Sequence, residues 1–186
     1  MFAVAYYTRS GHTKVLAEQL ARELGAEPRE IRGERDYGHL AMRFGALLNM
    51  YFRIKPMDLD FSSFELVVLC TPIWFGRPAC PFRTFLRDAR LKGKRLVIVL
   101  STWGDDTRMA IQHIERELTG KGVKVEFSIH VVTNNLSKDE LHAAGQELAK
   151  RISFQLAEPK LGRPLADATT GMQPKAPVEE GVQFPH

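Results

Sequence analysis

The stretch that decides the fold is Phe2-Ala3-Val4-Ala5-Tyr6-Tyr7-Thr8-Arg9-Ser10-Gly11-His12-Thr13. Its first six residues form a largely apolar run, which predicts a buried strand. Leu16, Leu20 and Leu24 follow at every fourth position, which predicts an amphipathic helix. Residues 8–13 must therefore form a tight loop between a strand and a helix.

The composition of this loop favours a phosphate ligand. The backbone N–H groups at a helix N-terminus attract anions, and the hydroxyls of Thr8, Ser10 and Thr13 can add hydrogen bonds. Gly11 allows the backbone to turn closely around a phosphate, while Arg9 adds positive charge. A capped helix after a simple turn would use the same residue types, so the loop alone leaves both interpretations open.

The remaining chain alternates strands and helices. Further strands are predicted at 26–32, 64–71, 94–101 and 123–132, and Pro28 makes the first of these an edge strand. Helices are predicted before and after each strand, including 137–156, which begins with a capping box. This pattern predicts an α/β fold with a doubly wound, five-stranded parallel sheet of order 2-1-3-4-5, whose ligand lies beyond the carboxyl ends of the strands.

Both tryptophans of the chain fall in loops at this predicted ligand edge. Trp74 follows the third strand and Trp103 follows the fourth. A tryptophan exposed there offers a flat surface on which an aromatic ligand can stack, although either ring could instead pack into the core.

Three loops resemble those of the flavodoxin family. Residues 8–13 are similar to its phosphate loop, and residues 71–78 are similar to its second flavin loop. The amino-acid sequence of residues 101–106 resembles that of the second flavin loop of short flavodoxins. These residues follow the fourth predicted strand, however, so their position assigns them to the third loop. The resemblance covers residues 1 to about 155 and implies a flavin mononucleotide (FMN) cofactor. It implies as cofactor-binding residues Thr8, Arg9, Ser10, Gly11, His12, Thr13, Pro72, Ile73, Trp74, Phe75, Gly76, Arg77, Thr102, Trp103 and Gly104.

The connection between the second and third strands is expected to hold an extra or enlarged crossover helix over 38–53. Its apolar residues occupy more than one side. An ordinary crossover helix is one interpretation. The alternative is that its outer face meets a second subunit in a homodimer, a quinone tail or a membrane surface.

Composition divides the chain into a domain over 1–156 and a tail over 157–186 that holds half of the ten prolines. We expect the tail to be disordered or extended. No apolar run is long enough to span a membrane and no signal peptide is evident, so a cytoplasmic location is expected. No nucleic-acid module and no metal-ligand cluster is present, and Cys70 and Cys80 lack the spacing for a metal site. Cys80 could have a lowered pKa near a helix start, or could simply be packed.

The formal net charge is +4, whereas flavodoxins that act as electron carriers are acidic as a family. If Arg77 and Arg9 face the flavin, they stabilise its reduced anion, which suits a reductase. We therefore expect an FMN-dependent oxidoreductase that passes electrons or hydride from a reduced donor to a small acceptor such as a quinone. No nicotinamide site is recognisable, which favours the alternative of a non-enzymatic carrier that docks to protein partners.

Overall fold

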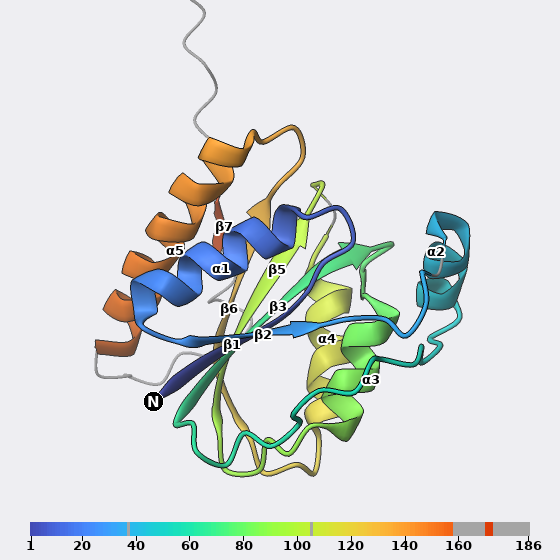
Figure 1. Ribbon diagram of the computed structural model, residues 1–186, viewed down its shortest axis with the longest axis horizontal. Coiled ribbons are helices and arrows are strands. Elements are labelled where there is room, and N and C mark those ends of the chain that lie inside the picture. Colours follow the sequence, from blue (N-terminus) through green and yellow to red (C-terminus); the bar gives the residue numbers. More distant parts are fainter. Residues whose placement is uncertain (37, 105, 158–169, 173–186) are drawn as a thin grey trace, which may run out of the picture.

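The computed structural model describes residues 1–36, 38–104, 106–157 and 170–172 of the chain. Its sheet has the strand order β2-β1-β3-β5-β6-β7, and β4 pairs with β3 off this path (Figure 1). The strands are β1 (Phe2–Tyr7), β2 (Glu27–Ile31), β3 (Leu66–Trp74), β4 (Arg77–Pro78), β5 (Arg95–Thr102), β6 (Lys124–Val132) and β7 (Thr170–Met172).

The sheet has two more strands than the five that the sequence predicts. β4 is a two-residue strand antiparallel to the end of β3, and β7 pairs parallel with Ile129–Val131 of β6. β7 lies within the proline-rich tail, so that part of the tail belongs to the sheet. Ala157, where the predicted tail begins, is the last residue of α5, and the tail residues 158–169 and 173–186 lie outside the described residues.

Helices cover both faces of the sheet. The helices are α1 (His12–Leu24), α2 (His39–Leu47), α3 (Cys80–Asp88), α4 (Arg108–Leu118) and α5 (Lys138–Ala157). Figure 1 shows α1 and α5 on one face and α3 and α4 on the other. One buried cluster joins Leu16 and Leu148 to one face of the sheet, and a second joins Phe82 and Ile114 to the opposite face. Because both faces are buried, the central strands carry continuous rather than alternating apolar residues.

The second crossover helix is shorter than the predicted span of 38–53. α2 ends at Leu47, and Asn49 adopts a left-handed conformation with φ of 57°. The N–H of Met50 donates to the carbonyl of Gly45 at 2.8 Å, which satisfies one of the last helical carbonyls. Residues 48–65 then return to the sheet without a further helix.

The chain after α2 is fastened to the body of the protein by polar contacts. The hydroxyl of Tyr51 donates to Glu117 of α4 at 2.7 Å, and Arg83 of α3 donates to the same carboxylate oxygen through Nε and Nη2 at 3.2 and 2.7 Å. The Arg83 guanidinium also lies 4.5 Å from the centre of the Tyr51 ring. Thr84 donates to the carbonyl of Phe52 at 2.7 Å. These contacts hold α2 at the edge of the molecule, beside α3.

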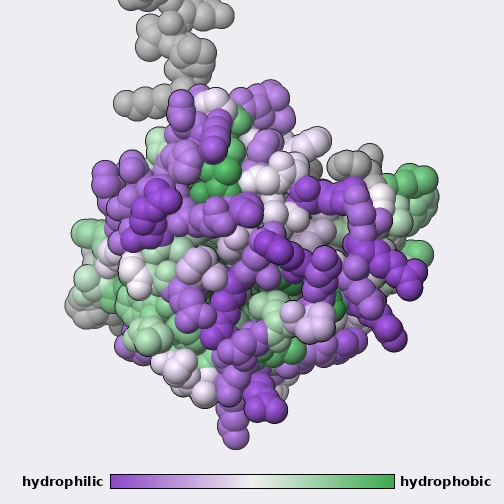
Figure 2. Space-filling view, viewed as in Figure 1, coloured by the Kyte–Doolittle hydropathy of each residue, from purple (hydrophilic) through white to green (hydrophobic). Residues whose placement is uncertain are grey.

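The outer side of α2 remains apolar and exposed. Figure 2 shows apolar side chains at the right-hand edge, where Figure 1 places α2. The exposed large apolar residues of this surface are Leu40, Phe44, Leu47, Leu48 and Met50. No helix within the described part of the chain has the length and apolar character needed to cross a membrane.

Glu117→Ala should destabilise the protein by about 3 kcal/mol, because it leaves the buried Arg83 guanidinium without its carboxylate. Urea unfolding followed by circular dichroism would measure the change. Glu147→Ala, which removes an exposed glutamate from α5, is the matched control and should change the stability by less than about 0.5 kcal/mol. Equal stability of the two variants would contradict this role for the ion pair.

Candidate functional site

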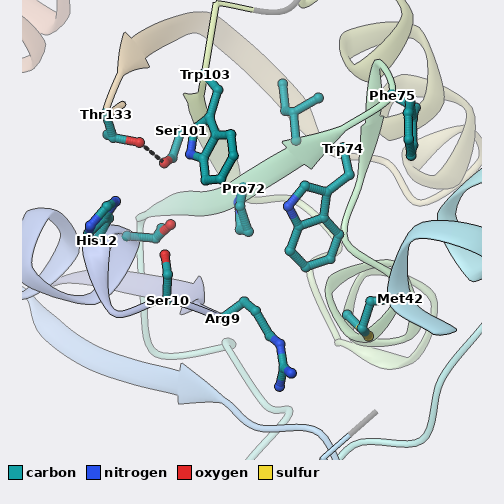
Figure 3. Close-up of a pocket in the computed structure, with 12 residues that line it drawn as sticks. Arg9, Ser10, His12, Met42, Pro72, Trp74, Phe75, Ser101, Trp103 and Thr133 are labelled. Carbon is teal, nitrogen blue, oxygen red and sulfur yellow. Dashed lines mark hydrogen bonds between the residues drawn. The ribbon is translucent and has the colours of Figure 1, made fainter. Parts of the chain in front are cut away.

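A cavity of about 380 Å³ lies at the carboxyl ends of the central strands (Figure 3). The loops after β1, β3, β5 and β6 contribute to it, and α2 closes one side. The lining residues are Arg9, Ser10, His12, Thr13, Met42, Pro72, Ile73, Trp74, Phe75, Ser101, Trp103 and Thr133. The parallel strands bring these residues together because their carboxyl ends meet at one edge of the sheet.

The first loop is folded so that the amides of the first turn of α1 stay available. Gly11 has a φ of 93°, a left-handed conformation that side-chain-bearing residues rarely adopt, and its N–H donates to the hydroxyl of Thr8 at 3.0 Å. Within the described part of the chain, no side chain caps α1 and its first turn contains no acidic residue. The N–H groups of this turn and the positive end of the helix dipole therefore remain free to bind an anion.

Arg9 and His12 bring polar atoms without partners to the cavity. The Nε of Arg9 and the Nδ1 of His12 are buried and have no hydrogen-bond partner among the described residues. Arg9 pairs with Asp36 through Nη1. Among the described lining residues Arg9 alone carries a permanent charge, and no carboxylate lines the cavity. Buried polar atoms are usually paired, so these two atoms indicate a missing anionic or polar ligand.

Trp74 is presented by a tight hairpin. It pairs with Arg77 across a two-residue turn in which Phe75 and Gly76 have φ values of 52° and 67°. Two positive φ values are those of a type I′ turn, which suits a hairpin. The half-buried Trp74 ring meets the ring of Tyr7 edge-to-face at a centroid distance of 6.4 Å, and burial raises the pKa of Tyr7 to about 12. Tyr7 therefore packs against Trp74 as an uncharged phenol.

Trp103 has the opposite character, because 69% of it is exposed. The residues around it are fixed by hydrogen bonds between the ends of β5 and β6. The Ser101 and Thr133 hydroxyls lie 2.9 Å apart, and the carbonyl of Thr102 accepts from the N–H of Thr133 at 2.9 Å. Figure 3 shows the two indole rings at the same cavity, with Arg9 and Ser10 on the side of the first loop. An indole left this open has surface available for an aromatic ligand.

Comparisons with solved structures identify the architecture. The fold matches a flavoprotein from Lactobacillus acidophilus solved in complex with FMN, with a TM-score of 0.62 and 20% identity over 69% of this chain and 91% of that one. It also matches the Trp repressor binding protein of Bacillus subtilis, with a TM-score of 0.54 and 19% identity over 80% and 99% of the two chains.

A flavodoxin, WrbA-like protein from Agrobacterium tumefaciens gives a TM-score of 0.52 and 15% identity over 83% and 96% of the two chains. This chain has the flavodoxin-like fold. No protein-family model and no curated protein sequence matches it.

The flavodoxin-like fold brings together most of the site residues that the sequence predicts. Arg9, Ser10, His12, Thr13, Pro72, Ile73, Trp74, Phe75 and Trp103 line the cavity. The others that were predicted do not line it: Thr8, Gly11, Gly76, Thr102 and Gly104 shape the turns, and Arg77 lies elsewhere.

Arg77 was expected beside Arg9 at the ligand, but it is not among the residues that line this cavity. Arg77 lies close enough to His113 of α4 to help lower the pKa of that imidazole, for which burial is the larger cause. Of the two arginines, only Arg9 lines the cavity.

Three residues that line the cavity were not predicted as site residues from the sequence: Met42, Ser101 and Thr133. Ser101 and Thr133 stand at the carboxyl ends of predicted strands, and that position was a usable signal. For Met42 the sequence held no such signal, because the orientation of its side chain depends on how α2 packs. The Sγ of Cys80 contacts the carbonyl of Met42 at 3.9 Å and links α2 to α3.

Both thiols should be unreactive in the folded protein. Cys70 and Cys80 are buried, and burial raises the pKa of each thiol, so little thiolate forms at pH 8. This excludes the lowered pKa considered for Cys80. We expect a thiol-specific colorimetric reagent to detect no cysteine in the native protein at pH 8 and both after unfolding in guanidinium. Rapid native reaction of Cys80 would contradict its burial.

Proposed function

We propose that this protein is an FMN-dependent oxidoreductase that passes electrons or hydride from a reduced donor to a small acceptor. One observation carries the proposal. Two tryptophans, Trp74 and Trp103, line one cavity together with an uncapped helix N-terminus that follows a hydroxyl-rich loop. An aromatic ring joined to a phosphate matches both halves of this cavity.

The cavity residues fit FMN in chemical type. The amides of the first turn of α1, with Ser10 and Thr13, would hold the phosphate, and Arg9 would balance its charge. His12 would use its buried Nδ1, which lacks a partner among the described residues, as a further polar contact. Trp74 and Trp103 would contact the flavin ring. The bound flavin would supply the capacity to accept and release electrons.

The charge around the cavity favours an oxidoreductase over a low-potential carrier. No carboxylate lines the described wall, and Arg9 is the one permanently charged residue among the described lining residues, so little in this wall would oppose negative charge on a bound, reduced flavin. This is the reverse of the acidic surroundings expected of soluble carriers. Arg9, and not Arg77, is the arginine among the described lining residues.

Trp74→Ala and Trp103→Ala should each weaken FMN binding by about tenfold, because each removes a stacking surface worth about 1–3 kcal/mol. Quenching of FMN fluorescence during titration of the apoprotein would give the dissociation constants. Phe154→Ala removes an aromatic residue of similar exposure, 64%, from α5 and serves as the control. FMN affinity that is the same in all three variants would rule out the proposed ring site.

The acceptor is proposed to be lipophilic, such as a quinone with an apolar tail. Met42 of α2 lines the cavity, while Phe44 of α2 and Leu48, which follows it, leave 56% and 66% of their surface exposed. Phe75 lines the cavity and is 51% exposed, so apolar surface is present at the cavity and on the outer side of α2. A tail that leaves the cavity could cover this surface.

The double substitution Phe44→Ser and Leu48→Ser should raise the KM for a long-tailed quinone by about tenfold and leave the KM for a tail-free benzoquinone unchanged. Steady-state turnover of the FMN-loaded protein would measure both constants. Phe154→Ser is the control for loss of an exposed apolar side chain.

Equal changes for the two quinones would contradict the tail site. Sedimentation that shows a dimer dissociated by the double substitution would instead assign the α2 surface to contact between two copies of the chain.

A further inference from the structure

A second cavity of about 280 Å³ adjoins the first, at the carboxyl ends of β1 and β2. Arg9 lines both cavities and therefore stands between them. The lining of the second cavity is much more polar, with seven charged side chains. Its residues are Tyr7, Thr8, Arg9, Glu30, Ile31, Arg32, Gly33, Glu34, Arg35, Asp36 and Lys55.

Backbone pairing holds one wall of this cavity in place. Gly33 and Ile54 form an antiparallel bridge. The N–H of Glu34 donates to the carbonyl of Arg53 at 2.9 Å, and the N–H of Lys55 donates to the carbonyl of Arg32 at 2.8 Å. Lys55 is thereby placed on a fixed backbone against the end of β2, although its side chain comes from the connection after α2.

The charges around the cavity leave an excess of positive groups. Each carboxylate already has a cationic partner: Asp36 pairs with Arg9, Glu30 with Arg32 at 2.6 Å, and Glu34 with Arg53 at 4.0 Å. The side chains of Arg35 and Lys55 have no ion-pair or hydrogen-bond partner within the described part of the chain. Both residues are exposed, so an anionic ligand that enters this cavity can reach two cations that no carboxylate of the described residues neutralises.

We propose that the second cavity binds the phosphate group of a nucleotide that reacts with the cofactor. The proposal rests on the proposed function, because the reaction partner must approach the flavin. Arg35 and Lys55 are the phosphate ligands, and Arg9 places this phosphate beside the cofactor cavity. The volume of 280 Å³ exceeds that of several water molecules at about 30 Å³ each, so the cavity has room for more than a bare phosphate.

Isothermal titration of the FMN-loaded protein with ADP at low ionic strength tests this site, because FMN prevents ADP from entering the first cavity. We expect Lys55→Ala and Arg35→Ala each to weaken ADP binding by about tenfold, since each removes a charged phosphate ligand. Lys92→Ala, at the opposite edge of the sheet, removes the same charge as Lys55→Ala and should leave the affinity unchanged. ADP affinity that is equal in Lys55→Ala and Lys92→Ala would overturn the proposal.

Two further probes identify which part of the nucleotide is bound. Adenosine should bind at least tenfold more weakly than ADP, because the site selects for phosphate. Inorganic phosphate should also bind more weakly than ADP, because the cavity accommodates more than the phosphate alone. Adenosine as tight as ADP would overturn the role of the cations, and inorganic phosphate as tight as ADP would overturn the nucleotide assignment.

The FMN affinity of Lys55→Ala separates this inference from the proposed function. We expect it to equal that of the unaltered protein, because Lys55 does not line the first cavity. A protein that binds no FMN would contradict the proposed function, whereas ADP binding that depends on Lys55 would still show the second site. Unchanged circular dichroism and urea midpoint would show that the variants are folded.

Discussion

The parallel pairing of β1, β3 and β5 is the constraint on which the rest of the structure depends. In its register Tyr6 lies opposite Cys70, and Cys70 lies opposite Val99. The chain therefore leaves all three strands at one edge of the sheet, where the loops after them meet. Neither tryptophan lies near the other in sequence, and only this pairing gives them a common cavity.

The site is supported from outside by contacts that do not use its interior. Tyr7 lies beneath Trp74, the Thr8 hydroxyl holds the turn at Gly11, and Thr133 connects the ends of two strands. Inside the cavity, by contrast, the Nε of Arg9 and the Nδ1 of His12 lack partners among the described residues. The loops of this site are held by hydrogen bonds and ring packing, while two polar atoms that face the cavity lack hydrogen-bond partners among the described residues. Such a site can bind a ligand with little rearrangement.

Arg9 connects the electrostatics of the two cavities. Its backbone belongs to the first loop, while its guanidinium pairs with Asp36 in the segment after β2. A ligand in either cavity changes the surroundings of the same cation. The second cavity also depends on Lys55, which is far from Arg9 in sequence and reaches this edge through pairing of the chain around Gly33 and Ile54. Charge counted along the sequence could not show which cations gather at one place.

The sequence by itself determined the alternation of strands and helices, the first loop and the edge at which both tryptophans would lie. Apolar periodicity and turn residues are local signals, and they were sufficient for these features. Tertiary structure decided the direction of individual side chains. Packing of α2 against α3 brought Met42 into the cavity. The left-handed Asn49 ended the helix predicted over 38–53, and pairing with β6 added β7 to the sheet. The positions of Met42 and β7 depend on contacts between segments distant in sequence, and no periodic pattern records such contacts.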